Sequence, residues 1–218
     1  MTEIFAPATL AFLGEALLRT LGMTLIGCSA GFAIGLALAL LRRSRAGWLA
    51  PARWLAMLWV EGFRRIPFLV ILMLVLFGVQ GLAPGLPLIG IATLAVTLAA
   101  SAYMAEIIRG GLESVPAAQV EGAEALGLSA GTITRTILLP QAWRVIVPPA
   151  AAFMVMFVKD TALASHLGVV ELAFAGKIMV NRGMSPVVGF GAVMLLYFAL
   201  SWPLGRAARA LEVRLART

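Results

Sequence analysis

Long apolar segments separated by short polar ones dominate the pattern along the chain. Residues 21–41, 66–105 and 183–205 contain no charged side chain. A helix needs about 20 apolar residues to cross the hydrocarbon core of a bilayer, so each segment predicts at least one membrane span. The second segment is too long for one span. It contains a cluster of Gly and Pro at residues 81–87, where we expect a turn between two spans.

The whole pattern predicts an all-α integral membrane protein, folded as one domain over residues 1–218 with about five transmembrane helices. The expected spans are residues 16–41, 54–80, 86–109, 144–169 and 184–208. The longest polar stretch, at about residues 110–143, lies between the third and fourth spans. We call this stretch the polar loop.

The polar loop carries its own helix signals. Residues 117–126 are rich in helix formers and follow Pro116, which suits a first helical turn. Gly127 suits the end of that helix, and Ser129 suits the N-cap of a second one. Pro140 is then expected to stop or redirect the chain, because proline lacks a backbone N–H. The loop therefore predicts two short helices that meet at a glycine.

Composition excludes a soluble protein. Of the 218 residues, 61% are hydrophobic and 12% are charged, whereas soluble domains carry about 25% charged residues. Five spans leave too little chain for a soluble catalytic domain in addition.

The basic residues mark one side of the membrane. A net charge of +7 would indicate a nucleic-acid partner in a soluble chain. Here one side collects Arg42, Arg43, Arg45, Arg53, Arg109, Arg135, Arg144, Arg206, Arg209, Arg214 and Arg217. Cytoplasmic loops are enriched in Lys and Arg. We therefore expect an N-terminus outside the cell membrane, a cytoplasmic C-terminus and no nucleic-acid partner.

Motifs for metal binding, nucleotide binding and catalysis are missing from the sequence. The single cysteine, Cys28, lies in an apolar run, and no CxxC or Cys/His cluster supports a metal site. There is no GxxxxGK(S/T) to cradle phosphates. The single histidine, His166, leaves little room for a catalytic set and is expected to be packed or hydrogen-bonded. We expect no enzyme activity and no directly bound cofactor.

Charged residues interrupt the fourth span. Such residues are costly in a bilayer and usually face a protein interior or water. Lys159 and Asp160, followed by Thr161, are candidates for contact with a zwitterionic solute, and Glu61 in the second span is a further candidate. Adjacent helix positions are about 100° apart, so Lys159 and Asp160 need not face one cavity, and Asp160 is the stronger candidate. The alternative is that these groups pair with other helices and only fix packing.

Two carboxylates have arginines at helical spacing. Glu61 has Arg64 and Arg65 at i+3 and i+4, and Glu106 has Arg109 at i+3. Side chains at these spacings meet on one helix face. We interpret both groups as structural ion pairs near the cytoplasmic boundary.

Gly27, Gly31 and Gly35 form a doubled GxxxG pattern in the first span. Small residues four apart allow another helix backbone to approach closely. The partner is either another helix of this chain or a second subunit, and the sequence leaves both interpretations open.

Seven residues of the polar loop stand at a family-specific spacing. They are Glu121, Gly122, Ala123, Gly127, Ile137, Leu139 and Pro140. This arrangement resembles the EAA loop of binding-protein-dependent ABC transporter permeases. In that family the loop forms coupling helices that dock in a groove of the ATP-binding subunit, which implies the same role here. Gly122 stands where the family usually has alanine, a change that loosens a helix by about 1 kcal/mol.

Further segments resemble the polar amino acid branch of that family. The matching segments are Glu61-Gly62-Phe63-Arg64 before Pro67, then Tyr103, Glu106, Ile107, Arg109 and Gly110, then Lys159-Asp160-Thr161 and Leu163-Ala164-Ser165. The chain departs from the branch at Arg65-Ile66, Ile71, Ala99 and His166. These departures leave the identity of the solute open.

The resemblance implies a permease subunit in a bacterial inner membrane, with a periplasmic N-terminus. It implies import by alternating access, powered by ATP and Mg²⁺ on a partner ATPase. The implied partners are two ATP-binding subunits, a second permease subunit (identical or similar), a periplasmic solute-binding protein and membrane lipid. Two alternatives are an ABC permease for another small polar solute and a transporter driven by an ion gradient.

Overall fold

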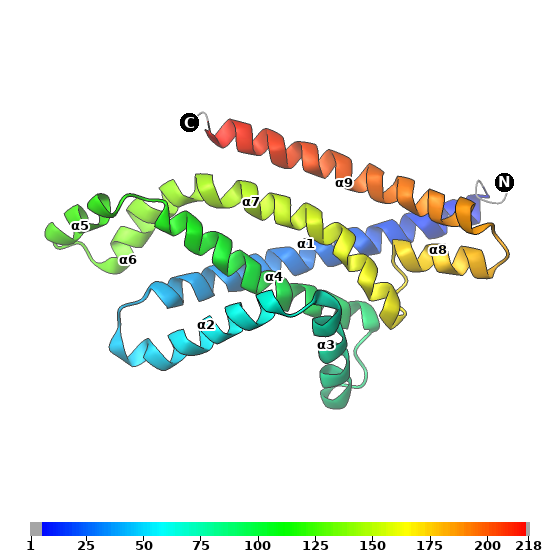
Figure 1. The fold of residues 1–218 in the computed structure, drawn as a ribbon, viewed down its shortest axis with the longest axis horizontal. Coiled ribbons are helices and arrows are strands. Elements are labelled where there is room, and N and C mark those ends of the chain that lie inside the picture. Colours follow the sequence, from blue (N-terminus) through cyan, green and yellow to red (C-terminus); the bar gives the residue numbers. More distant parts are fainter. Residues whose placement is uncertain (1–5, 217–218) are drawn as a thin grey trace.

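The computed structural model of the chain describes residues 6–216, so Arg217, one of the expected cytoplasmic arginines, lies outside the described residues. The helices are α1 (Pro7–Arg43), the 3-10 turn η2 (Gly47–Leu49), α2 (Ala50–Arg65), α3 (Phe68–Leu82), α4 (Leu88–Glu113), α5 (Ala117–Ala125), α6 (Ala130–Ile133), the π-helical η3 (Thr134–Leu138), α7 (Leu139–Asp160), the 3-10 helix η4 (Thr161–Leu167), α8 (Leu172–Asn181) and α9 (Pro186–Ala216). Figure 1 shows the long helices α1, α4, α7 and α9 along one axis. The end with α5 and α6 lies opposite the end with α8 and the N-terminus.

Within residues 6–216, four helical runs are long and apolar enough to cross a membrane. They are α1, α4, the run from Ala130 to Leu167, and α9. The bent pair formed by α2 and α3 adds a fifth if it counts as one span. The prediction of an all-α membrane protein with about five spans is therefore confirmed. Helices α1, α4 and α9 overlap the expected spans 16–41, 86–109 and 184–208.

The second expected span, residues 54–80, is not one helix. Helix α2 ends at Arg65, and α3 begins at Phe68 after a bend of 117°. Ile66 has an extended backbone, with φ −91° and ψ 131°, because the ring of Pro67 disfavours the helical region for the residue before it. Helix α3 consequently projects to one side of the long helices (Figure 1). The absence of charge predicted that this segment lies in the membrane, but it carried no information about the direction of α3 relative to α2.

Pro140 does not stop or redirect the chain, contrary to the prediction. It lies in the first turn of α7, and helical structure continues from Ala130 to Leu167. A first-turn position leaves the missing N–H of proline without consequence, and the preceding turn, η3, is π-helical. The helix of the fourth expected span therefore begins at Leu139, and the second loop helix leads directly into it.

The stripe of Gly27, Gly31 and Gly35 packs inside the chain. A Cβ added at Gly31 would lie 2.5 Å from the Cβ of Ala100, and one added at Gly35 would lie 2.7 Å from the backbone nitrogen of Ala105. All three glycines are buried against α4. Of the two interpretations left open, the structure shows close packing between α1 and α4.

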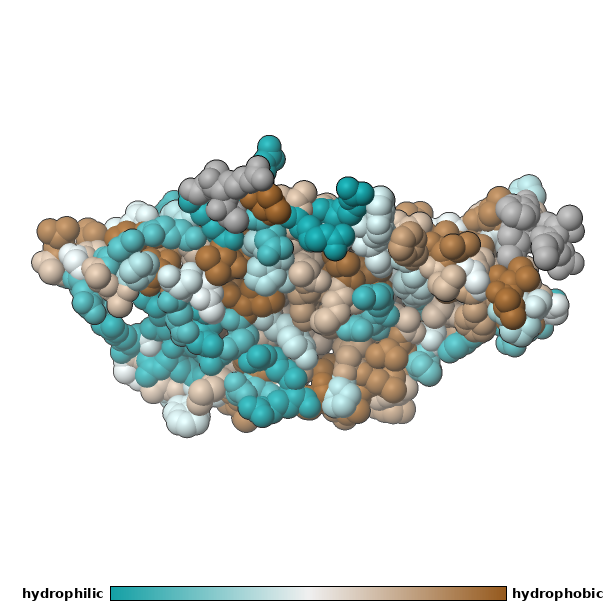
Figure 2. Space-filling view, turned by 45° about the horizontal axis from the view of Figure 1, so that its top comes forward, coloured by the Kyte–Doolittle hydropathy of each residue, from teal (hydrophilic) through white to brown (hydrophobic). Residues whose placement is uncertain are grey.

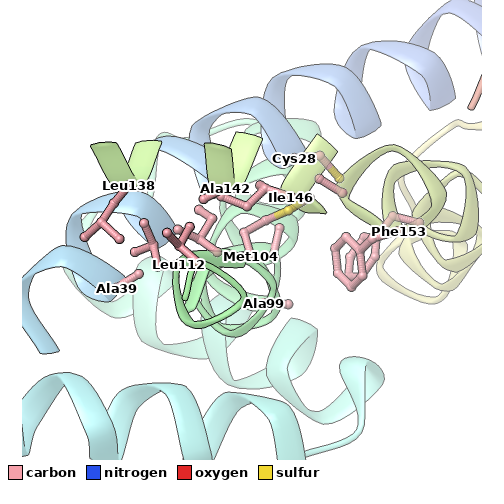
Figure 3. Close-up of a cluster of buried hydrophobic side chains, with 14 of the residues drawn as sticks. Cys28, Ala39, Ala99, Met104, Leu112, Leu138, Ala142, Ile146 and Phe153 are labelled. Carbon is pink, nitrogen blue, oxygen red and sulfur yellow. The ribbon is translucent and has the colours of Figure 1, made fainter. Parts of the chain in front are cut away.

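A buried apolar cluster joins α1, α4 and α7. Figure 3 shows Cys28 and Ala39 from α1, Met104 and Leu112 from α4, and Ile146 from α7 gathered in it. Each of these five side chains is at most 3% exposed. Close packing of this kind makes the three helices move together.

Apolar side chains also cover the outside of the long helices. Ile26 on α1 is 64% exposed, and Leu195 and Phe198 on α9 are 63% and 62% exposed. Patches of this kind suit a hydrocarbon environment. On the face in Figure 2, much of the hydrophilic surface lies toward the end with α5 and α6.

Candidate functional site

The polar loop folds as two helices that meet at Gly127. This glycine has φ +76°, a left-handed conformation that glycine adopts without a steric penalty. The N–H of Leu128 donates to the carbonyl of Ala123 at 3.1 Å, which satisfies a carbonyl at the end of α5. The Ser129 hydroxyl accepts a hydrogen bond from the Thr132 N–H at 3.2 Å and so caps α6. We call α5, α6 and η3 the loop helices.

One face of the loop helices is built into the core of the membrane domain. Ala123, Ile133 and Leu138 are 4%, 2% and 1% exposed. They belong to the same buried cluster as Leu112 and Val115 at the end of α4. Because a close-packed interior transmits displacement, a push on the loop helices reaches the ends of α4 and α7.

The opposite face of the loop helices is open. Glu121 and Gly122 are exposed, and Leu126 and Leu128 are 81% and 40% exposed. A Cβ added at Gly122 would meet no atom within 4 Å, so packing does not require glycine there. The other residues of the predicted motif are Ile137 and Leu139, which are half-buried, and Pro140, which is exposed. This face offers carboxylate and leucine side chains to a partner.

Glu106 on α4 is the centre of an ion-pair cluster that joins three helices. Its carboxylate lies 3.4 Å from Arg42 of α1 and 3.5 Å from Arg64 of α2, and it also pairs with Arg109. Arg109 pairs in turn with Glu113. Helical spacing pointed to Arg109 alone, because Arg42 and Arg64 reach Glu106 only through the tertiary fold. We call these five residues the Glu106 cluster.

Glu61 pairs with Arg65 rather than with Arg64. The carboxylate and guanidinium are 2.8 Å apart, and the side chains are 41% and 79% exposed. Surface pairs of this kind contribute little to stability. Arg64 instead turns toward α4, where it joins the Glu106 cluster.

The charged pair of the fourth span lies where α7 ends. Asp160 is half-buried and Lys159 is exposed, and neither side chain makes a hydrogen bond or salt bridge with residues 6–216. Thr161 is buried, and its hydroxyl donates to the carbonyl of Val158 at 2.7 Å. The threonine hydroxyl is therefore used within its own helical turn. A carboxylate without a partner in a membrane span is unfavourable unless water, a solute or another subunit reaches it.

His166 differs from the prediction. It lies in η4 and is exposed, and no hydrogen bond to its side chain is present within the described residues. The short helix α8 follows it in the chain and packs against α9 and α1. In the part of the chain that the structure describes, no group of three His, Cys, Asp or Glu side chains could hold a metal ion.

Glu171, just before α8, is fully buried at 0% exposure. Its carboxylate accepts hydrogen bonds from the N–H groups of Ala173 and Phe174, at 2.9 and 2.8 Å, and so caps α8. It also accepts one from the hydroxyl of Tyr197 on α9, at 2.7 Å. Burial raises the pKa of Glu171 above its usual range, although these donors and Lys177 act in the opposite direction. In the sequence, the only signal for this N-cap was the position of Glu171 just before the mostly apolar residues that form α8.

Several known proteins are similar to this chain. A "Probable glutamine ABC transporter permease protein GlnP" of Bacillus subtilis (strain 168) is 34% identical, over 94% of each chain. The "Arginine ABC transporter permease protein ArtQ" of Haemophilus influenzae is 29% identical, over 95% of each chain.

Among solved structures, one described as "Crystal structure of an amino acid ABC transporter with histidines" matches with a TM-score of 0.84 and 25% identity, over 94% of each chain. A MetNI methionine ABC transporter in an inward-facing conformation matches the fold with a TM-score of 0.83, at 23% identity. Residues 31–217 match the family described as "Binding-protein-dependent transport system inner membrane component". The chain therefore belongs to this family of multi-pass inner-membrane transport components.

Proposed function

We propose that this chain is the transmembrane permease subunit of an ATP-driven ABC importer for a polar amino acid or a close analogue. The similar permeases are named for glutamine and for arginine, and a similar solved structure is an amino acid ABC transporter. On this proposal the chain itself carries no nucleotide or catalytic site, and ATP and Mg²⁺ bind to a separate ATPase.

One observation carries the proposal: the loop helices have a buried inner face and an open outer face. The inner face shares a core with α4 and α7, and the outer face presents Glu121 and Leu126 to a partner. A partner that moves the outer face therefore moves the spans. This geometry suits a coupling element between an ATPase and a translocation path.

The proposed partners are two ATP-binding subunits, a second permease subunit and a periplasmic solute-binding protein. A second permease subunit is needed because five helices are few for a translocation path. Helix α3 also projects from the bundle, with Leu74 and Phe77 62% and 69% exposed. In the proposed cycle the binding protein delivers the solute, the ATPases close on ATP, and hydrolysis restores the inward-facing state.

The end of the molecule with the loop helices is proposed to be cytoplasmic. The C-terminal end of α9 lies toward this end, and the N-terminus lies at the other (Figure 1). Arg42, Arg43 and Arg45, where α1 ends, are on the same side as the loop helices, because Arg45 pairs with Glu124 of α5 at 3.1 Å. This arrangement agrees with the enrichment of arginine on cytoplasmic surfaces.

The proposal is tested by uptake in proteoliposomes that contain the permease, its ATPase and its binding protein. The variant Glu121→Ala should insert normally but lose solute uptake while ATP hydrolysis continues, because the outer face of α5 no longer transmits motion. The matched control is Glu15→Ala, an exposed carboxylate of α1 near the opposite end.

Normal uptake by Glu121→Ala combined with Gly127→Ala would overturn the coupling role. Uptake by vesicles that contain this chain alone, without ATPase or ATP, would favour the alternative of a transporter driven by an ion gradient. Loss of uptake in the Glu15→Ala control would show that the assay responds to any change in the chain.

A further inference from the structure

A basic cavity lies where α1, α2 and α4 meet, and the proposed transport cycle does not use it. The cavity has a volume of about 360 Å³ and is open on one side. Its lining includes Arg42 and Arg43 from the end of α1, Arg53 and Trp54 from the start of α2, and Arg109 from α4. These segments lie at the end of the molecule that carries most of the arginines.

The cavity carries a surplus of positive charge. Its lining contains four arginines and one carboxylate, that of Glu113. The adjoining Glu106 cluster adds one more arginine, Arg64, and one more carboxylate, Glu106 itself. Five guanidinium groups thus face two carboxylates, a surplus of three positive charges. A group of like charges next to a low-dielectric membrane domain attracts an anion strongly.

The lining arginines differ in how far their side chains are already engaged. Arg53 is used to close the connection after α1, donating to two backbone carbonyls at 2.7 and 2.8 Å. Arg42 reaches Glu106 only at 3.4 Å and shares it with Arg64 and Arg109. Arg43 is exposed and makes no hydrogen bond or salt bridge with residues 6–216.

The rim of the cavity is apolar along α2. Trp54 and Met57 line the cavity, and Leu58 follows them at helical spacing on the same face. Their exposed fractions are 70%, 36% and 71%. Tryptophan favours the boundary between the headgroups and the hydrocarbon of a bilayer. The site therefore combines a cationic pocket with an adjoining apolar strip.

We infer that this cavity binds the phosphate group of an anionic phospholipid, with the acyl chains lying along Trp54, Met57 and Leu58 of α2. Guanidinium groups match phosphate oxygens in geometry and charge. Basic pockets between transmembrane helices are suited to anionic headgroups. A free phosphate ion would leave the apolar strip unused.

The test uses the permease purified with its ATPase in nanodiscs of phosphatidylglycerol or of phosphatidylcholine. Native mass spectrometry after detergent extraction measures how many lipids stay bound per permease. We expect phosphatidylglycerol to be retained in preference to phosphatidylcholine. Arg42→Gln and Arg43→Gln should each weaken phosphatidylglycerol binding by about fivefold, the effect expected for one arginine near a membrane surface. Glycerol 1-phosphate, which has the phosphate but no acyl chains, should not displace the lipid.

The matched control is Arg65→Gln. It also removes one positive charge, but Arg65 lies on α2 outside the cavity lining. It should retain phosphatidylglycerol as the wild type does. Equal retention of the two lipids, or wild-type retention by the double variant of Arg42 and Arg43, would overturn the inference. Displacement by glycerol 1-phosphate would point to a free organic phosphate instead. Crosslinking of Arg43→Cys to a second permease subunit would show that protein covers the site.

Discussion

Single residues differ in how far their role depends on the rest of the fold. The sequence predicts both Thr161 and Asp160 as candidates for contact with a solute, but the Thr161 hydroxyl donates to the carbonyl of Val158. Asp160 keeps an unpartnered carboxylate at the end of α7. Asp160 therefore stays our stronger candidate for contact with a solute.

We expect Asp160→Asn to lower solute uptake by about tenfold or more at saturating binding protein, because hydrogen bonds to charged groups contribute about 1.5–3 kcal/mol. ATP hydrolysis stimulated by the binding protein should stay within about twofold of wild type, since the loop helices are untouched. Asp160→Glu should restore part of the uptake. Glu212→Gln, an exposed carboxylate on α9, serves as the control. Wild-type uptake by Asp160→Asn would remove this residue from the solute path.

The raised pKa of Glu171 predicts that the stability of the folded chain depends on pH. Its pKa is raised above the ordinary value of 4.5, with burial as the largest cause, so the folded chain holds this proton more tightly than the unfolded chain does. A group of this kind makes the folded state less stable as pH rises from about 4.5 through the folded pKa. We expect the apparent Tm in detergent to fall over this range for the wild type.

Glu171→Gln should flatten this part of the profile, because glutamine does not titrate. Tyr197→Phe removes a donor that favours the charged carboxylate, so its apparent Tm should fall more over the same range. Glu15→Gln should follow the wild type. Identical profiles for Glu171→Gln and wild type would contradict the prediction.

At the scale of elements, the sequence pattern located helices well but missed how they join. The first helix of the polar loop was predicted to end at Gly127, and this glycine does lie between α5 and α6, with a left-handed backbone conformation. The bend at Pro67 and the continuous passage through Pro140 were not predicted, although both residues are prolines. The difference is positional, because Pro67 follows an extended residue whereas Pro140 lies in a first helical turn.

Gly122 and Gly127 of the polar loop should respond to alanine in opposite directions. Gly122→Ala should stabilise α5 by about 1 kcal/mol, because glycine is a poor helix former and the site is open. Gly127→Ala should destabilise the loop by about 1–2 kcal/mol, because a Cβ is unfavourable in the left-handed region. Limited proteolysis of the loop in the purified complex measures both effects. Faster cleavage of Gly122→Ala than of wild type would contradict the prediction.

At the scale of the whole molecule, the arginine distribution predicts a sidedness that labelling can test. Cys28 is the single cysteine and is fully buried, so it gives little background. Arg182→Cys, after α8, should react with a membrane-impermeant thiol reagent added to spheroplasts. Arg214→Cys, near the end of α9, should react only after the membrane is opened. The reverse pattern would invert the proposed orientation.

The sequence by itself determined the membrane class, the number of spans and the family. These follow from the absence of charge over span-length segments and from local motifs, which depend on residues close together in the chain. Tertiary structure decided the packing of Gly31 on Ala100, the approach of Arg42 and Arg64 to Glu106 and the burial of Glu171. Each of these features depends on which distant helix packs alongside. The complementary shapes of the packed surfaces decide this, and the hydrophobic pattern of the sequence does not show those shapes.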